Sequence, residues 1–146
     1  MDMISRRALI QAAAVTGVGV VASAAPARAM QPVDAKMAGG VYYTAAYPGR
    51  WSGKAASHAP RITVTPQADG AKAVEIVTEH KMHGYKHYIV KHVLLDANYG
   101  FLDETVFNPE SDEAKSTHTL PPGYTGPVYA LSMCNLHDVW LSAAQA

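Results

Sequence analysis

The 146-residue chain has a single cysteine, Cys134, and no excess charge of either sign, with 12 Lys and Arg against 12 Asp and Glu. One cysteine excludes an intramolecular disulfide framework and a four-cysteine zinc or iron site. The balanced charge provides no electrostatic footprint for a nucleic-acid backbone, so no nucleic-acid partner is expected. Charged residues make up only 16% of the chain and hydrophobic residues 49%, which favours one compact folded domain over disorder.

Residues 1–29 have the three parts of an export signal. Arg6 and Arg7 form a charged start, an Ala-, Val- and Gly-rich run follows from Gln11 to Ala25, and a small-x-small site ends at Ala29. The run is short and weakly apolar, so we expect cleavage and no stable membrane insertion of the mature chain. The paired arginines are typical of a twin-arginine signal, with an ordinary secretory signal as the alternative. The prediction is a periplasmic domain, residues 30–146, with a net charge near −2.

The mature chain has the pattern of an all-β protein. Short β-branched and aromatic runs recur between Gly, Asn and Pro turns, and no segment keeps a helical period of 3.6 residues. The expected strands are 40–44, 61–65, 73–78, 88–96, 104–107, 116–120, 128–134 and 139–141. Seven or eight short strands at this spacing predict an antiparallel β-sandwich.

One hairpin is predicted with particular clarity. Polar and apolar residues alternate from Arg61 to Thr65 and again in 73–78, and an Asp69-Gly70 turn lies between the two segments. Pairing of these strands places the residues before Arg61 and those after Thr78 at the same end of the sandwich. His58 is therefore expected close to His80 and His83.

Seven histidines in so short a chain exceed what packing or surface needs usually supply. His80, His83 and His87 lie around Gly84, while Cys134 and His137 are three residues apart at the end of an expected strand. Imidazole and thiolate together favour Fe, Cu or Zn over Mg or Ca.

Two further histidines are interpreted as surface or hydrogen-bond-satisfied side chains, namely His92 and His118. Strand alternation predicts that His87, Ile89 and Lys91 share one face, whereas His92 lies on the other. His87 and His92 are therefore not expected to serve one site.

Three motifs resemble the superoxide reductases, the desulfoferrodoxin and neelaredoxin family. Cys134-Asn135-Leu136-His137, followed by Val139-Trp140, is similar to the Cys-Asn-x-His-Gly-Leu-Trp signature of that family. The segment from His80 to Ile89, with Met82, His87 and Tyr88, is similar to its His-Pro-Met and His-Tyr-Ile elements. His58-Ala59-Pro60 resembles its first His-x-Pro. The three motifs occur in the family's order between Ser57 and Trp140.

The resemblance implies an immunoglobulin-like β-sandwich that holds one mononuclear iron. Its ligands would be four equatorial histidines and one axial thiolate, at His58, His80, His87, His137 and Cys134. The implied activity is one-electron reduction of superoxide to hydrogen peroxide, after which an unidentified electron donor reduces the iron again. Because the chain has no cysteines for a second iron domain, it resembles the single-iron class.

The sequence also departs from the family pattern. One extra residue between His80 and His87 makes His83 a rival ligand, and Asp138 replaces the Gly that follows the last ligand. Lys91 stands where an aromatic residue would follow the His-Tyr-Ile element.

The most consequential departure lies before His58. Ala56-Ser57 stands where the family has Glu-Lys, and the resemblance implies that this Lys draws in superoxide. A mature chain near −2 offers little global steering for an anion, so a local cation is needed. The candidates are Lys54, Arg61 and Lys86.

Two other kinds of function compete with this interpretation. An exported blue-copper carrier also uses His and Cys in a β-sandwich, but no Met follows His137 to serve as its axial ligand. An iron electron carrier would share the metal site without the reductase activity. A non-catalytic sandwich module that binds another protein would have histidines that do not converge on Cys134. The oligomeric state, including a homo-oligomer, stays open.

Overall fold

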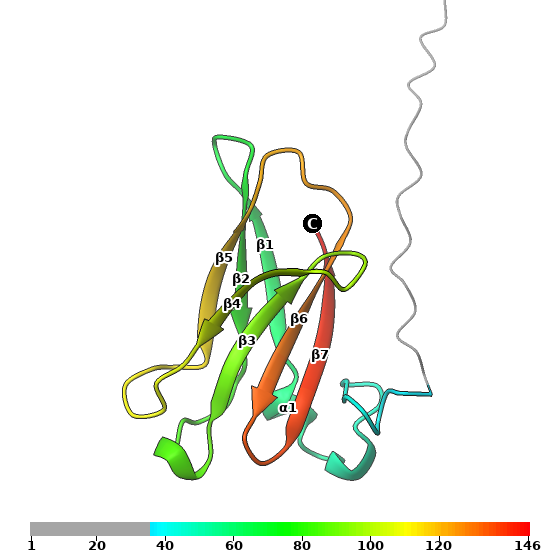
Figure 1. The fold of residues 1–146 in the computed structure, drawn as a ribbon, viewed down its shortest axis with the longest axis vertical. Coiled ribbons are helices and arrows are strands. Elements are labelled where there is room, and N and C mark those ends of the chain that lie inside the picture. Colours follow the sequence, from blue (N-terminus) through cyan, green and yellow to red (C-terminus); the bar gives the residue numbers. More distant parts are fainter. Residues whose placement is uncertain (1–35) are drawn as a thin grey trace, which may run out of the picture.

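The computed structural model describes residues 36–146, so the predicted export signal lies outside the described residues. Two antiparallel sheets pack face to face (Figure 1), one with the strand order β1-β2-β5 and the other with the order β4-β3-β6-β7. The strands are β1 (Arg61–Pro66), β2 (Lys72–Val77), β3 (Ile89–Leu95), β4 (Phe101–Val106), β5 (Lys115–Leu120), β6 (Pro127–Cys134) and β7 (Asp138–Gln145). The predicted antiparallel β-sandwich is confirmed.

Helical structure in the described part is limited to single turns. They are η1 (Gly49–Trp51), α1 (Ala55–His58) and η2 (Gly84–Lys86). Within residues 36–146, no helix has the length and apolarity needed to span a bilayer.

The β1–β2 hairpin forms as the alternation predicts. Ile62 pairs with Ile76 and Val64 with Val74, so apolar side chains from both strands share the inner face. At the turn, Gly70 has a φ of 83°, which glycine adopts without steric cost. The inner face of this hairpin contributes to the main core between the sheets, which comprises Val74, Ile76, Leu94, Leu120, Val128 and Ala130.

Three predicted strands differ from the structure. The segment expected at 104–107 begins three residues earlier, because β4 is Phe101–Val106. Segment 40–44 is not a strand, because it turns back on itself at Gly39 (φ 84°) and contacts β7 through Tyr43 alone. The segment expected at 139–141 is instead the eight-residue strand β7, which pairs with β6 along the whole length of that strand.

The predicted alternation along β3 is also wrong. Ile89 and His92 are both fully buried, although strict alternation puts them on opposite faces. The register with β6 shifts between Ile89 and Lys91, and a bulge of this kind re-aims the side chains that follow it.

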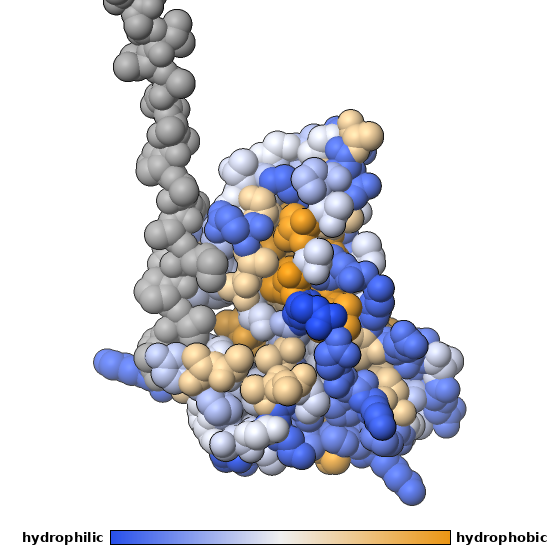
Figure 2. All heavy atoms as spheres, turned by 180° about the vertical axis from the view of Figure 1, so that it is seen from behind, coloured by the Kyte–Doolittle hydropathy of each residue, from blue (hydrophilic) through white to orange (hydrophobic). Residues whose placement is uncertain are grey.

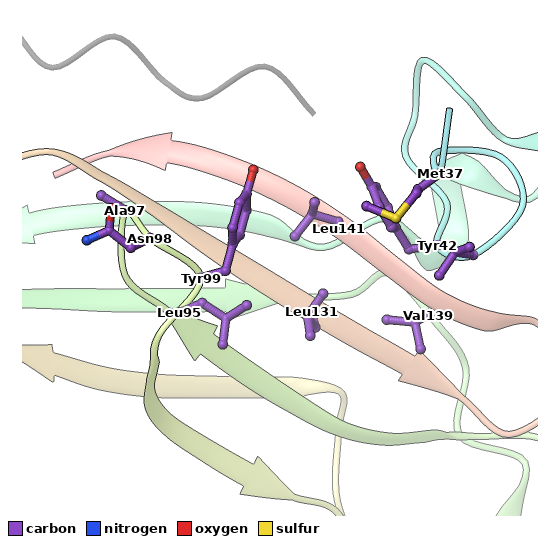
Figure 3. Close-up of a pocket in the computed structure, with 10 residues that line it drawn as sticks. Met37, Tyr42, Leu95, Ala97, Asn98, Tyr99, Leu131, Val139 and Leu141 are labelled. Carbon is purple, nitrogen blue, oxygen red and sulfur yellow. The ribbon is translucent and has the colours of Figure 1, made fainter. Parts of the chain in front are cut away.

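The face away from the viewer of Figure 1 is mostly hydrophilic, and its most hydrophobic side chains gather near its centre (Figure 2). A separate apolar hollow of about 630 Å³ lies over β6 and β7, where Leu131, Val139 and Leu141 form its floor between Tyr42 and Tyr99 (Figure 3). Among the described residues that line it there is no histidine, cysteine or carboxylate. The ligand-type side chains therefore lie elsewhere.

Candidate metal centre

Five potential ligands lie at one end of the sandwich, the lower end in Figure 1. His58 ends α1, His80 follows β2, and His87 lies between η2 and β3. Cys134 ends β6, and His137 lies in the short turn that leads into β7. We call these five residues the donor cluster. The confirmed β1–β2 hairpin explains why His58 and His80 meet, with their ring centroids 4.8 Å apart.

The donor atoms of the cluster face one another. His137 Nδ1 lies 3.0 Å from His58 Nε2, 3.0 Å from His87 Nε2 and 3.5 Å from Cys134 Sγ. In these four residues the ligand atoms all lie within 4.8 Å of one another. This spacing suits the shared coordination of one metal ion.

His80 joins the cluster through His87, because the Nε2 atoms of the two rings are 3.0 Å apart. The other nitrogen, His80 Nδ1, is buried and has no hydrogen-bond partner among the described residues. His80 therefore lacks the partner on its far nitrogen that usually orients a metal-binding histidine. The predicted rival, His83, instead stacks on His87 with 6.1 Å between ring centroids, and its backbone N–H donates to the His87 carbonyl.

The orientation of His58 is set by its neighbours in α1. Its Nδ1 lies 3.1 Å from the Lys54 carbonyl oxygen and 2.8 Å from Ser57 Oγ. Because a carbonyl oxygen only accepts hydrogen bonds, Nδ1 carries the proton and Nε2 presents its lone pair to the cluster. A partner of this kind on the far nitrogen is typical of metal-binding histidines.

Burial keeps the imidazoles of the cluster neutral. It lowers the pKa of His58 and of His80 to about 4, and it also lowers the pKa of His87 and His137. Burial raises the pKa of the Cys134 thiol, whereas a bound cation would favour the thiolate. Neutral imidazoles and a thiolate are the forms that bind a metal. The donor set fits iron and the other transition metals that the sequence favours.

A pocket of about 310 Å³ opens beside the cluster, and His58, His80 and His87 form part of its wall. Lys54 and Lys81 also line this pocket. The charge of Lys54 reaches the cluster, since after burial it is the next cause that lowers the pKa of His137. The wall also includes the Glu79 carboxylate, which is paired with Arg61, so the two lysines leave the pocket wall with a positive balance of charge.

The three predicted cations are therefore not equivalent. Lys54 lines the pocket, whereas Arg61 forms an exposed ion pair with Glu79 at 2.9 Å. Lys86 is exposed and does not line the pocket. Lys81 was missed by the sequence analysis, although its position next to His80 was a usable signal.

Asn135 is a second residue that the sequence analysis assigned no role. Its Oδ1 accepts a hydrogen bond from the Tyr88 N–H at 2.9 Å, and its Nδ2 donates to the Lys86 carbonyl at 3.3 Å. These bonds tie the turn between Cys134 and His137 to the loop that carries His87.

His92 and His118 lie outside the cluster, as predicted, but they are in the protein interior and not at its surface. His92 Nε2 lies 2.9 Å from Thr78 Oγ1, and His92 Nδ1 lies 2.9 Å from Ser116 Oγ. His118 contacts Ser116 Oγ at 2.9 Å and Asp103 Oδ2 at 2.8 Å. Both rings are hydrogen-bond-satisfied, so that part of the interpretation agrees with the structure.

The chain is similar to several known proteins. The family model described as desulfoferrodoxin matches residues 50–143. A variant of superoxide reductase (neelaredoxin) from Ignicoccus hospitalis is 27% identical, with a TM-score of 0.63 over 72% of this chain and 92% of that one. No curated protein matches the sequence.

Two more distant structures share the fold. Superoxide reductase from Nanoarchaeum equitans is 17% identical, with a TM-score of 0.54 over 62% of this chain and 93% of that one. A variant of superoxide reductase (neelaredoxin) from Archaeoglobus fulgidus, in the reduced form, is also 17% identical. Its TM-score is 0.53 over 62% of this chain and 88% of that one. The family match extends over more than half of the chain and includes all five residues of the donor cluster. This chain therefore belongs to the desulfoferrodoxin family.

Proposed function

We propose that the protein is a single-iron superoxide reductase, which reduces superoxide by one electron to hydrogen peroxide. The observation that carries the proposal is the convergence of histidine nitrogens and Cys134 Sγ beside a pocket whose wall includes Lys54 and Lys81. The ligands we assign are His58, His80, His87 and His137, with Cys134 as the thiolate. When bound, the iron supplies the electron, passing from the ferrous to the ferric state, and two protons complete the hydrogen peroxide.

The protein's own groups prepare the site for this reaction. The Lys54 carbonyl and Ser57 hold the His58 ring so that Nε2 faces the cluster. Burial keeps the imidazoles unprotonated, so they do not repel a cation. Cys134 packs in an apolar cluster with Ile89, Phe107 and Ala114, which limits the access of water to the sulfur.

We assign the attraction of superoxide to Lys54, because this chain has Ser57 where the family pattern has Lys. Lys54 lines the pocket, and its charge influences the groups of the donor cluster. A cation so placed raises the local concentration of an anionic substrate. Lys81 adds a second positive charge to the same pocket wall.

The proposal extends to the location of the protein. Residues 1–29 direct export by the twin-arginine route, and the mature domain works in the periplasm with an electron donor whose identity is open. Replacement of Arg6 and Arg7 by Lys tests this route. Retention of the full-length chain in the cytoplasm supports it, and unchanged export contradicts it.

The experiment that tests the central proposal is metal analysis with optical spectroscopy on residues 30–146. We expect about one iron per chain and a visible thiolate-to-iron band that disappears on reduction. Rapid mixing of the reduced protein with superoxide should then yield hydrogen peroxide without oxygen evolution. Copper with an intense blue band would indicate the electron carrier instead, and a metal-free protein would contradict both.

A matched pair of variants tests the role of Lys54. Lys54→Met should lower the second-order rate constant for superoxide by about tenfold and weaken its dependence on ionic strength. Lys86→Met removes the same charge from an exposed residue that does not line the pocket, and we expect the parent rate. Equal effects of the two substitutions would contradict the assignment.

A further inference from the structure

Asp138 has an unusual backbone conformation directly after His137. Its φ is 61°, in the left-handed region, where Asp is tolerated better than most residues and Gly is unstrained. The family pattern has Gly at this position, which the backbone conformation explains. An aspartate here accepts some conformational cost, so its carboxylate needs a separate explanation.

The carboxylate binds a segment that is remote in sequence. Asp138 Oδ2 accepts hydrogen bonds from Trp51 Nε1 at 2.8 Å and from Arg50 Nη2 at 2.6 Å. Arg50 also lies over the Trp51 ring, with its guanidinium carbon 4.7 Å from the ring centroid. The hydrogen bond from Arg50 holds the pKa of Asp138 below its usual range, so the acceptor stays ionised and its bonds are charge-assisted.

Trp51 contacts the donor cluster directly. Its ring meets the His137 ring at an interplanar angle of 87°, with 4.7 Å between centroids. From Trp51 the chain continues into the site, because the Trp51 carbonyl accepts from the Lys54 N–H at 2.9 Å and α1 with His58 follows. Asp138 therefore links the turn that carries His137 to the segment that carries Lys54 and His58.

We propose that Asp138 is a positioning residue that holds the Trp51 indole against His137 and so keeps the metal centre closed on that side. The role depends on one carboxylate that is anchored beside His137 and reaches across to Trp51. Its effect on metal retention rests on the proposed iron centre, whereas its effect on Trp51 does not.

Tryptophan fluorescence of the metal-free protein tests the contact without any metal. The described residues contain two tryptophans, and Trp140 is fully buried, so quenching by acrylamide reports on the half-buried Trp51. Asp138→Gly keeps an unstrained left-handed backbone and removes the carboxylate. We expect the quenching constant of this variant to rise about twofold as Trp51 becomes accessible. Trp51→Phe identifies the signal that belongs to Trp51.

The rate of iron loss to a chelator is the second measurement. Removal of a group that orients a metal ligand typically weakens metal binding by about 10- to 100-fold, and we expect Asp138→Gly to speed iron loss by about tenfold. Asp138→Asn keeps an oxygen that accepts a hydrogen bond from Trp51. Its rate of iron loss should therefore lie between the rates of Asp138→Gly and of the parent protein. Glu75→Gln removes the remote ion pair with Lys115 and serves as the control.

Unchanged quenching in Asp138→Gly overturns the proposal, and so does an unchanged rate of iron loss. If Asp138→Gly fails to fold, Asp138→Asn decides by the same two measurements. A parent protein that binds no iron contradicts the proposed function, and in that case the metal-free quenching still shows whether Asp138 holds Trp51.

Discussion

The protein contains two groups of histidines with different surroundings. The first is the donor cluster, and the second is the interior network formed by Thr78, His92, Asp103, Ser116 and His118. Burial lowers the pKa of His58 and of His92 alike to about 4. In the cluster one nitrogen of each ring faces another ring nitrogen or the sulfur, whereas in the network every ring nitrogen faces a hydroxyl or a carboxylate. Burial and a lowered pKa therefore do not separate ligands from structural histidines, but the partners of the nitrogens do.

Every ring nitrogen of the interior network has a hydrogen-bond partner. His118 Nδ1 donates to the Asp103 carboxylate, and His118 Nε2 lies 2.9 Å from Ser116 Oγ. His92 Nδ1 lies 2.9 Å from Ser116 Oγ, and His92 Nε2 lies 2.9 Å from Thr78 Oγ1, which donates its own hydrogen to Ser132 Oγ. All four ring nitrogens are therefore engaged by hydroxyls or a carboxylate of the protein.

Ser116, His118 and Asp103 have the hydrogen-bond order of a catalytic triad. Ser116 is nevertheless only 5% exposed, and its oxygen is shared with the second imidazole, His92. A substrate has no direct path to this hydroxyl. We therefore interpret the arrangement as structural.

The largest expected effect separates the two groups by metal content. Cys134→Ala removes the only thiol of the chain, and we expect complete loss of the thiolate-to-iron band and of stable iron binding. Metal analysis and the visible spectrum measure both losses. Retention of full iron by this variant would contradict the assignment of Cys134 and with it the proposed centre.

Low pH should destabilise both groups of histidines, because burial lowers the pKa of imidazoles in each of them. The pKa of His92 is about 4 in the folded protein and 6.5 in the unfolded chain, so the unfolded chain binds more protons between these values. Stability is therefore fully present above pH 6.5 and is lost as the pH falls toward 4, by about 3 kcal/mol for His92. His58 and His80 add losses in the same direction in the metal-free protein.

Urea unfolding of the metal-free protein at a series of pH values measures this loss. Bound iron should oppose it, because protons compete with the metal for the imidazoles, and release of iron should begin as the pH falls below neutrality. If the free energy of unfolding of the metal-free protein increased as the pH was lowered from 6.5 to 4, the direction of the pH dependence derived from His92 would be contradicted.

The sequence predicted the sandwich and the meeting of His58 and His80 because both depend on local patterns. Alternation from Arg61 to Thr65 and a turn at Asp69-Gly70 are enough to fix which residues end up together. The extent of β7 depends instead on its pairing with β6, and segment 40–44 fails as a strand because only Tyr43 of this segment forms a bridge to β7. Such pairings lie outside the range of local periodicity.

Within the candidate site, the five predicted ligands lie together, and their binding of a metal stays a prediction. The residues that hold them were harder to foresee. Asn135 and Asp138 act through bonds to Tyr88 and Trp51, which are remote in sequence. The burial of His92 follows from the bulge in β3, which is a matter of register with β6 and has no signature in the sequence.

A substitution within the interior network should change stability and leave the metal in place. His92→Leu keeps an apolar core but leaves the Thr78 hydroxyl and one site on Ser116 without an imidazole partner. We expect the free energy of unfolding of the metal-free protein to fall by about 2 kcal/mol, with iron content unchanged. Loss of iron without loss of stability would contradict the division between the two groups of histidines.

The smallest effect is expected at the outer end of the interior network. The Asp103 side chain is 57% exposed, so Asp103→Ala leaves His118 Nδ1 where water can replace the carboxylate. The lost charge-assisted bond should cost only about 1 kcal/mol, and Asp103→Asn, which keeps an acceptor, should cost about half as much. Thermal and urea unfolding measure both values, with iron content as the control. A loss at Asp103 that equals the loss for His92→Leu would show that the charge anchors the whole network. The present geometry argues against this result, because His92 satisfies two buried hydroxyls whereas Asp103 satisfies one partner near water.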